Sequence, residues 1–179
     1  MNKSFISLGL MSGTSMDGVD ASIIKSNGLD EIRVILNKYS PYNRNIRKNL
    51  HLLRDKINTS NDLKFFFEEI KSVEKEITLF HANFIDEIIK KLNIKIDLIG
   101  FHGHTIFHNA SEKISKQIGD GELLSQLTKK KVIYDFRKND LKNGGQGAPL
   151  TPIFHKLLKK IFKIKEVAFI NIGGITNIT

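Results

Sequence analysis

The sequence predicts an α/β fold built on a mixed sheet. Three short apolar segments near the N-terminus are rich in β-prone residues and are separated by glycine-containing turns, which is typical of an antiparallel meander. The remainder of the chain alternates helical patterns with short apolar runs, and strands that follow crossover helices join a sheet in parallel. We therefore expect a five-stranded sheet, with three antiparallel strands followed by parallel ones, flanked by helices.

The first three expected strands run from Phe5 to Met11, from Val19 to Lys25 and from Glu31 to Leu36. In the third strand, alternate residues are apolar and fall on one face of the sheet. The turn between the second and third strands contains Asn27-Gly28, which is a strong hairpin signal. These segments therefore predict the antiparallel meander.

Two helices are expected after the loop at Pro41. The first spans about Asn45 to Ile57, and the second runs from about Asn61 to Leu92, with apolar residues three and four positions apart along one stripe. Thr59 and Ser60 are expected to cap the start of the second helix. A helix of this length, rich in phenylalanine, is expected to cover the sheet.

The second half of the chain continues with shorter elements. We expect strands at Ile96–Phe101 and Val132–Phe136, and helices at Glu122–Thr128 and from the N-cap Thr151 and Pro152 to about Phe162. The last segments are a strand from Val167 to Ile172, a Gly173-Gly174 turn and the beginning of a strand from Ile175 to Thr179. This order repeats that of the first two strands, which predicts a duplicated domain whose second copy has only begun.

Composition excludes several classes of protein. The 28 lysines and arginines exceed the 19 acidic residues and give a formal charge of +9, but the bases are mostly lysine, whereas nucleic-acid recognition favours arginine forks and aromatic platforms. The absence of cysteine excludes a disulfide scaffold, a cysteine zinc site and a thiol nucleophile. No apolar run approaches the roughly 20 residues of a membrane span. We expect a cytoplasmic globular protein that binds neither nucleic acid nor membranes.

The turn between the first two strands has the composition of a phosphate loop. From Ser12 to Gly18 it combines two glycines, several hydroxyl groups and the carboxylate of Asp17. Glycines let backbone N–H groups approach an anion, hydroxyls add donors, and a carboxylate can hold Mg²⁺ directly or through water. The same composition also suits an ordinary polar hairpin loop. It is not a P-loop, because no Gly-Lys-Ser/Thr follows the glycines.

Three histidines, His102, His104 and His108, follow the strand that ends at Phe101. Such a cluster can bind zinc where three or four ligands converge. Polar side chains at the carboxyl end of a strand also line the ligand crevice of α/β proteins. We favour a role for these histidines in lining a ligand crevice over a role in binding zinc.

Further polar candidates lie in the later loops. The segment from Arg137 to Leu150 lacks hydrophobic periodicity and contains several glycines, so we expect a long functional loop. Within it, Arg137 can donate a fork to a polar ligand and Asp140 can accept hydrogen bonds from it, whereas an exposed ion pair between the two is the alternative. Gln117 and Asp120 carry a weaker form of the same argument.

Several motifs, in order, resemble the anhydro-N-acetylmuramic acid kinases, relatives of the hexokinase, actin and Hsp70 ATPase fold. The resemblance covers essentially the whole chain and rests on LGLMSGTSMDGVDASI from Leu8, GFHGHTIFH from Gly100, QIGD from Gln117, DFR from Asp135 with Asp140, GGQGAPL from Gly144 and NIGGITN from Asn171. The chain differs from the family's usual pattern at His104, where the family has glutamine, and at Phe101, where it has a smaller polar residue.

The resemblance implies a two-lobed sugar kinase that binds MgATP between its lobes, with residues 1–165 as an actin-like N-terminal lobe and residues 166–179 as the first strands of a truncated second lobe. It assigns to the nucleotide Gly13, Thr14, Ser15, Met16, Asp17, Gly18, Val19, Asp20, Gly173 and Gly174, with Asp17 near Mg²⁺ or its waters. It assigns to the sugar His102, Thr105, Gln117, Arg137 and Asp140. The family's catalytic aspartate would lie beyond Thr179.

The implied reaction uses ATP to phosphorylate the 6-oxygen of 1,6-anhydro-N-acetylmuramic acid while water opens the anhydro ring, which returns peptidoglycan sugar to metabolism. One hypothesis is that the chain is the N-terminal lobe of such a kinase, as a split-gene product, a truncated reading frame or a fragment. Its partners would then be the sugar, ATP, a separately encoded C-terminal lobe and, as in the family, a second copy. The other hypothesis is a non-catalytic remnant or binding module of the same fold.

Overall fold

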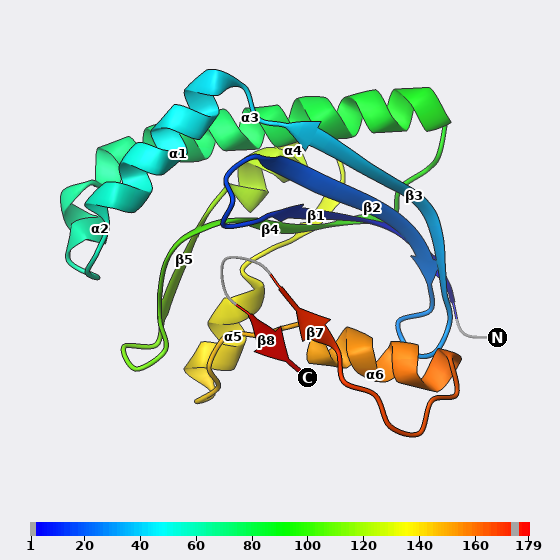
Figure 1. Cartoon of the computed structure of the whole chain (residues 1–179). Helices are drawn as coiled ribbons and strands as arrows, with labels where there is room; N and C mark the ends of the chain where they lie inside the picture. The colour runs from blue at the N-terminus through cyan, green and yellow to red at the C-terminus, as the bar shows by residue number, and fades with distance from the viewer. Residues whose placement is uncertain (1–2, 173–175) are drawn as a thin grey trace.

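The computed structural model describes residues 3–172 and 176–179. Within them the main sheet has six strands, in the order β3-β2-β1-β4-β5, with β6 paired to β4 (Figure 1). The strands are β1 (Phe5–Ser12), β2 (Gly18–Ser26), β3 (Ile32–Pro41), β4 (Leu98–Asn109), β5 (Ile114–Ile118) and β6 (Lys131–Ile133). The helices are α1 (Arg44–Lys56), α2 (Asp62–Phe65), α3 (Phe67–Leu92), α4 (Gly121–Thr128), α5 (Phe136–Lys142) and α6 (Pro152–Ile161).

The predicted meander is confirmed. β1 pairs antiparallel with β2, and β2 pairs antiparallel with β3. The turn between β2 and β3 is held by its own asparagine, because Asn27 Oδ1 accepts the backbone N–H groups of Leu29, Asp30 and Glu31. Gly28 takes a φ of +75° in this turn, a conformation that glycine adopts without steric cost.

The later strands join as expected, with one addition. β4 pairs in parallel with β1, and β6 pairs in parallel with β4, as crossover connections predict. β5 forms an antiparallel hairpin with the second half of β4, so the sheet has six strands rather than the predicted five. The expected strand ending at Phe101 continues to Asn109. The sequence did not predict this continuation, because the polar residues after Phe101 interrupt the apolar run that is typical of a buried strand.

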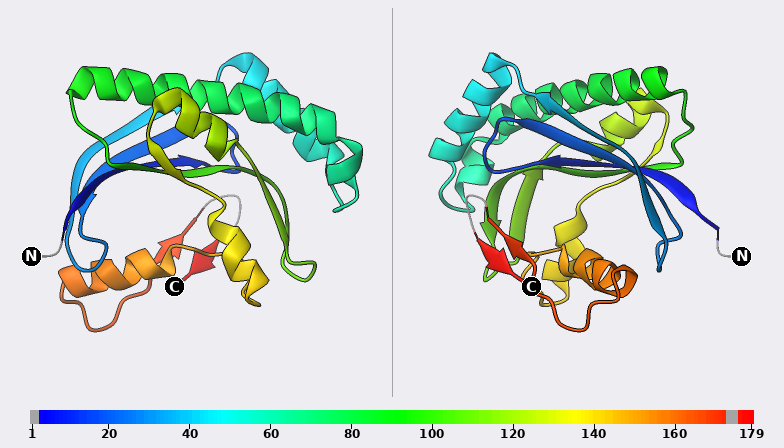
Figure 2. Two further views of the ribbon diagram at one scale, coloured as in Figure 1. Left: turned by 180° about the vertical axis from the view of Figure 1, so that it is seen from behind. Right: turned by 45° about the vertical axis from the view of Figure 1, so that its right-hand side comes forward.

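The sheet is covered unequally on its two faces. α1, α3 and α4 lie over one face, and α5, α6 and a small two-stranded ribbon lie on the other side (Figures 1 and 2). Along β1, Leu8, Leu10 and Ser12 are buried toward the helices, whereas Gly9 and Met11 are exposed on the opposite face. The core between the sheet and the helices includes Leu8, Val19, Ile23, Ile46, Leu50, Ile77, Ile85, Ile88, Ile99 and Phe101.

The long helix expected after the Thr59 region is divided at Phe66 into α2 and α3. The expectation that Thr59 and Ser60 cap this helix is wrong. The Thr59 hydroxyl donates to Asp62 Oδ2 at 2.9 Å, and the same oxygen accepts the Thr59 backbone N–H at 2.7 Å. The carboxylate of Asp62 therefore closes the turn, and the hydroxyl acts as a donor where a cap requires an acceptor.

The segment from Arg137 to Leu150 is not one long loop, because α5 occupies its first part. A helix of 7 residues is too short to show a hydrophobic period. α6 begins at Pro152 as predicted, but Thr151 makes no side-chain cap. Its φ of −68° and ψ of −20° are helical, whereas a capping residue adopts an extended conformation.

The C-terminal strands are shorter than expected. β7 (Ile170–Asn171) and β8 (Asn177–Ile178) form an antiparallel ribbon separate from the main sheet. The predicted Gly173-Gly174 turn lies outside the described residues. Among the helices of the described segments, none combines the length and the apolar character needed to cross a membrane.

Candidate functional site

The Gly13–Gly18 loop leaves the carboxyl end of β1 and returns into β2. The Met16 backbone N–H donates to Gly13 O at 3.1 Å and closes a turn. Met16 has a φ of 57° and a buried side chain, whereas Thr14 and Ser15 are exposed. The loop is thus anchored in the core by Met16 and presents two hydroxyl groups to solvent.

Asp17 supplies an exposed carboxylate to this loop. Ser15 Oγ donates to Asp17 Oδ1 at 2.6 Å, and this hydrogen bond, with a smaller contribution from Arg47, holds the pKa of Asp17 below its ordinary value. The Asp17 backbone oxygen accepts the Tyr42 N–H at 2.9 Å. An ionised carboxylate beside hydroxyl groups suits a hard cation such as Mg²⁺. Asp17 therefore presents an ionised carboxylate at the surface of the loop, and its role toward Mg²⁺ stays a prediction.

The three residues after Asp17 differ in whether their side chains are accessible to a ligand at the loop. A Cβ at Gly18 would lie 2.7 Å from the Tyr39 ring and closer still to Ser40 O, so only glycine fits against β3. Val19 is fully buried, and its side chain belongs to the core rather than to the loop surface. Asp20 is exposed on the opposite face of the sheet.

A bulge in β4 decides which of its side chains face the core. The β1–β4 register shifts near the end of β1, and Gly103 takes a φ of +69° at the irregularity. Phe101 and His104 are consequently both buried on the helix side, although they are three positions apart. His102 lies between them on the opposite face, toward α5.

His102 is held as a neutral imidazole with one defined tautomer. Its Nδ1 lies 3.0 Å from Gly103 O, and because a carbonyl only accepts, Nδ1 carries the proton. Nε2 then accepts from Arg137 Nε at 3.1 Å. Burial lowers the pKa of His102, and the Arg137 charge lowers it further. The ring is therefore an acceptor toward α5 at neutral pH.

Thr105 and Gln117 meet across the β4–β5 hairpin, on the face of the sheet that His102 shares. Gln117 Nε2 donates to Thr105 Oγ1 at 3.1 Å and to Ser115 Oγ at 2.7 Å. Both Thr105 and Gln117 are partly exposed. The hairpin thus brings together two predicted sugar contacts that lie on separate segments of the sequence.

The side chains of Arg137 and Asp140 both form hydrogen bonds with the backbone of Gly147. Arg137 Nη1 donates to Gly147 O at 2.8 Å, and Asp140 Oδ2 accepts from Gly147 N at 2.7 Å. A Cβ at Gly145 would collide with the Asp140 carboxylate. The exposed Arg137–Asp140 pair is absent from the described part of the chain, because both side chains are directed at the glycine turn.

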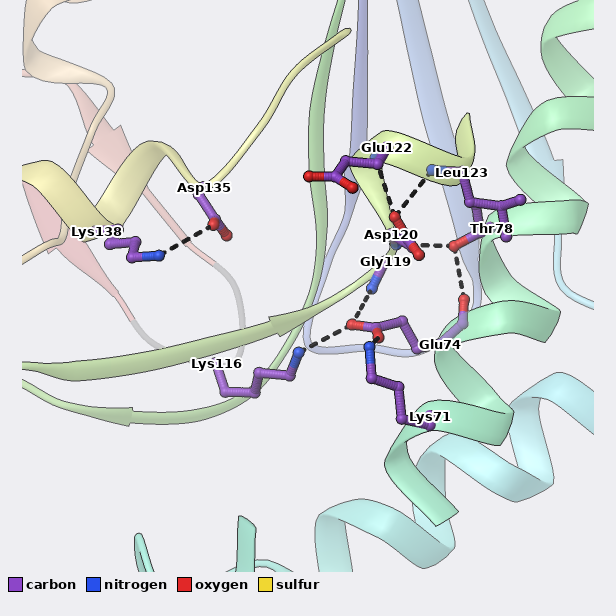
Figure 3. A network of polar contacts seen from close by, with 10 residues as sticks. All are labelled: Lys71, Glu74, Thr78, Lys116, Gly119, Asp120, Glu122, Leu123, Asp135 and Lys138. Carbon is purple, nitrogen blue, oxygen red and sulfur yellow. Dashed lines mark hydrogen bonds and ion pairs between the residues drawn. The ribbon is translucent and has the colours of Figure 1, made fainter. Parts of the chain in front are cut away.

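Asp120 caps α4, and this use was not anticipated. Its Oδ1 accepts the N–H groups of Glu122 and Leu123 at 3.0 and 2.9 Å, and its own N–H donates to Thr78 Oγ1 at 2.9 Å (Figure 3). The Asp120 carboxylate is thus engaged by a helix N-terminus. The signal that could have revealed this role is the helical segment that begins directly after Asp120, because aspartate is a preferred N-cap residue.

Glu74 is a buried carboxylate that the sequence analysis missed. Lys71 and Lys116 contact its two oxygens at 3.0 and 2.9 Å, and Gly119 N donates to Oε1 at 3.4 Å (Figure 3). Burial by itself would raise the pKa of Glu74, but the hydrogen bonds from the two lysines lower it overall. A single carboxylate within the apolar stripe of the long helix was the signal that could have revealed it.

A cavity of about 650 Å³ lies over the sheet face that α1 and α3 do not cover. It is lined by Gly9, Leu10, Met11, Asp20, Ala21, Ser22, Asn37, Lys38, Tyr39, Gly100 and Phe136. Of the predicted site residues it includes only Asp20. The other residues escaped sequence analysis because they come from four strands and α5, and no motif joins them.

The three histidines His102, His104 and His108 do not converge. His104 is buried under the helices, His102 faces Arg137, and His108 Nδ1 contacts Ser115 Oγ at 3.0 Å. Over residues 3–172 and 176–179, no three histidine, aspartate or glutamate side chains form a group that could hold a metal ion.

These features define a class of protein: an α/β domain whose mixed sheet carries a glycine- and hydroxyl-rich loop after its first strand and a polar segment on the neighbouring parallel strand. The model of the family described as anhydro-N-acetylmuramic acid kinase matches residues 5–179. The chain belongs to this family, which confirms the resemblance seen in its motifs.

Curated relatives described as anhydro-N-acetylmuramic acid kinases agree. The relative from Pelagibacter ubique is 59% identical over 180 residues, which cover 100% of this chain and 48% of the relative. The Gluconobacter oxydans relative is 40% identical over 173 residues, covering 96% of this chain and 47% of the relative. The Rhizobium etli relative is 38% identical over 177 residues, covering 96% and 48%. The chain thus spans about half the length of the curated relatives it matches.

Proposed function

We propose that this chain is the N-terminal half of an ATP-dependent kinase that opens 1,6-anhydro-N-acetylmuramic acid and phosphorylates its 6-oxygen, giving N-acetylmuramic acid 6-phosphate. One observation carries the proposal: Ser12, where the loop begins, is the register partner of His104 on the parallel strand β4. The loop therefore leaves the carboxyl end of β1 beside the polar segment around His102, at the point where the parallel pairing of β4 with β1 ends. The carboxyl end of parallel pairing is where α/β proteins bind ligands.

On the nucleotide side, the Gly13–Gly18 loop would bind the phosphates of ATP, with Thr14 and Ser15 as hydroxyl donors. Asp17 would hold Mg²⁺ directly or through water, and its lowered pKa keeps it ionised for that role. The metal neutralises charge on the transferring phosphoryl group. Gly173 and Gly174 would add backbone donors from the second lobe.

On the sugar side, His102, Thr105, Gln117, Arg137 and Asp140 would contact hydroxyl, amide and carboxylate groups of the substrate. Arg137 uses Nε and Nη1 for His102 and Gly147, and a guanidinium has five N–H donors. Donors therefore remain for a carboxylate, which a guanidinium binds in bidentate fashion. Both ring nitrogens of the neutral His102 are engaged, Nδ1 by Gly103 O and Nε2 by Arg137 Nε, so His102 would contact the sugar with its ring and orient Arg137 toward it.

The second lobe would begin within this chain. In this proposal residues 1–165 form the N-terminal lobe and residues 166–179 the first strands of the second, in keeping with a β7–β8 ribbon that pairs apart from the main sheet. The aspartate that activates water as general base would come from polypeptide beyond Thr179, either continuous with this chain or separately encoded. A dimer like that of the family is part of the same proposal.

The test is reconstitution. The purified chain is mixed with MgATP and the anhydro sugar, with and without a polypeptide equivalent to the second half of the Pelagibacter relative, and ADP release is followed. We expect turnover only in the mixture, and its loss when Asp17→Asn replaces the native chain. No turnover in either case, together with no ligand-induced rise in melting temperature, would instead support a non-catalytic remnant or binding module.

A further inference from the structure

Four buried polar side chains meet directly behind the Gly13–Gly18 loop. Ser12 ends β1, His104 is its partner on β4, His81 lies on α3, and Tyr42 lies between β3 and α1. Their exposed fractions are 2%, 0%, 0% and 4%. Neither the nucleotide side nor the sugar side of the proposed site uses them.

Two contacts in this cluster define hydrogen positions. Ser12 Oγ lies 3.0 Å from His104 Nδ1, and His81 Nδ1 lies 2.8 Å from Ile77 O. Because the Ile77 carbonyl only accepts, His81 Nδ1 must carry the proton. His81 Nε2 is therefore a buried acceptor that requires a donor.

Three polar atoms of the cluster lack a partner among the described residues: Tyr42 Oη, His81 Nε2 and His104 Nε2. Leaving a buried polar atom unpaired costs about 1–3 kcal/mol, so three in one place call for an explanation. The groups are neighbours: the Tyr42 and His81 rings are 6.3 Å apart between centroids. His81 also contributes to the lowered pKa of His104, and Ser12 acts on that of Tyr42.

Donor and acceptor requirements place the His104 proton on Nε2. His81 Nε2 needs a donor, which is either His104 Nε2–H or Tyr42 Oη–H, and in the second case the Tyr42 oxygen would accept from His104 Nε2–H. We take the first, because Ser12 lies close enough to the Tyr42 hydroxyl to act on its pKa. If His104 Nε2–H is the donor, its Nδ1 becomes the acceptor for the Ser12 hydroxyl. The Ser12 oxygen can then accept from Tyr42 Oη–H, and every atom of the cluster has a partner.

We propose that Tyr42, Ser12 and His104 form a directional hydrogen-bonded relay that continues through His81 to Ile77 O, and that this relay positions the Gly13–Gly18 loop. The Tyr42–Ser12 and His104–His81 links close by a small side-chain adjustment or through one internal water. Burial lowers the pKa of both histidines to about 4, so both rings stay neutral at pH 7, as the relay requires.

The relay holds both ends of the loop. It fixes Ser12, where the loop begins, while the Tyr42 backbone N–H holds Asp17 O at 2.9 Å near its end. His104 is thus a positioning residue that acts through Ser12. The value of this positioning for phosphate binding rests on the proposed function, but the relay itself does not.

The hydrogen positions can be read directly by ¹⁵N NMR of the histidine side chains in the purified chain at pH 7. We expect neutral rings, with the proton on Nδ1 in His81 and on Nε2 in His104. A charged ring, or a proton on Nδ1 of His104, would overturn the relay. The His104 and His81 signals are assigned by their loss in His104→Gln and His81→Leu, and His108→Gln, which removes an exposed histidine outside the cluster, is the control.

The positioning role is tested by amide hydrogen exchange in His104→Leu and His104→Gln. Leucine cannot bond Ser12, whereas glutamine can accept from Ser12 and donate to His81. We expect the Met16 and Tyr42 amides to exchange about tenfold faster in the leucine variant, as for the loss of one hydrogen bond, and to recover in the glutamine variant. Ile88→Ala, a core change near the far end of α3, is the matched control. Equal exchange in the leucine variant and the control, or a glutamine variant as labile as leucine, would overturn the role.

Tyr42→Phe removes a single hydroxyl and is expected to fold. If Tyr42 Oη donates to Ser12, the variant melts at a lower temperature. If the hydroxyl is unpartnered, its removal leaves the melting temperature unchanged or raises it, and the first link of the relay is wrong. Neither readout involves nucleotide or sugar, so failure of the kinase proposal and failure of the relay are distinguishable.

Discussion

Gly18 and Gly9 differ in whether their surroundings leave room for a Cβ atom. Gly18 lies where the loop enters β2, and a Cβ there would lie 2.7 Å from the Tyr39 ring and closer still to the Ser40 backbone oxygen. At Gly9, in β1, the nearest atom to a Cβ is Ser22 O at 3.9 Å. Both glycines lie in the first two strands, but only Gly18 is required by its surroundings.

Alanine substitutions at these two glycines form a matched pair. We expect Gly18→Ala to lower the free energy of unfolding by about 2 kcal/mol, because β3 or the loop must shift to accept the methyl group. Gly9→Ala should change it by less than about 0.5 kcal/mol. Denaturant unfolding followed by circular dichroism measures both, and equal losses would contradict the close contact at Gly18.

The buried histidines predict an acid-sensitive fold. The pKa of His81 and of His104 falls from 6.5 to about 4 on burial. Between these values the unfolded chain binds protons that the folded chain does not, so stability is complete above pH 6.5 and decreases as the pH is lowered through this window. Each histidine contributes a slope of up to about 1.4 kcal/mol per pH unit.

Urea unfolding between pH 5 and pH 7 measures that slope. We expect His81→Leu to reduce it by about 1 kcal/mol per pH unit, whatever the variant does to stability at pH 7. His108→Gln removes an exposed histidine and should leave the slope as it is. A wild-type slope retained in His81→Leu would show that the ring is not held neutral by burial.

At the scale of elements, β4 serves the core and the candidate site at once. The Gly103 bulge lets Phe101 and His104 pack beneath the helices while His102 and Thr105 lie on the opposite face. Behind β4 and β5, Glu74 ties α3 to Lys116 and Gly119 (Figure 3). Because Gln117 follows Lys116 and faces the other side, the same anchor sets where Gln117 is presented.

Removing the Glu74 charge tests this anchor. Glu74→Gln is expected to lower the free energy of unfolding by about 2 kcal/mol, less than the 3–5 kcal/mol of a fully buried pair, because the Lys71 and Lys116 side chains are 51% and 35% exposed. Asp86→Asn, which breaks the exposed pair with Lys90, should cost under about 0.5 kcal/mol. Thermal unfolding measures both, and similar small losses would show that Glu74 is not an anchor.

At the scale of the whole molecule, apolar exposure is concentrated toward the C-terminus. Ile153 in α6 is 84% exposed, Phe162 is 64% exposed, and Ile170, Ile172 and Ile178 around the ribbon are 60%, 81% and 67% exposed. A two-stranded ribbon alone is marginally stable in water. In the proposed kinase, the second lobe would cover these side chains.

Removal of the ribbon should therefore reduce self-association. We expect a chain ending at Lys165 to remain monomeric at concentrations where the full chain associates, because exposed apolar strand edges promote pairing. Light scattering over a concentration series measures this. Equal association of the two chains would show that the surface responsible for self-association lies outside the ribbon, and α6 would be the next region to test.

Features that local chemistry encodes were predictable from the amino-acid sequence. The apolar runs and the Asn27 turn predicted the meander, Pro152 predicted the start of α6, and the motifs from Leu8 and Gly100 placed the chain in its family. Such features depend on residues close together in the chain, whose period or turn type is visible without a partner.

The other features became visible only in the folded protein. The inward turn of His104 depends on a contact with Ser12 on a distant strand. The pairing of β5 with β4 and the contacts of Arg137 and Asp140 with Gly147 join residues that are closer in the chain, but no periodicity or motif encodes them. A bulge of one residue reverses which side chains face the core, and a glycine within the strand, such as Gly103, does not by itself show whether a bulge forms there. The loop was therefore visible in the sequence, whereas the relay behind it became visible only when four separate elements were brought together.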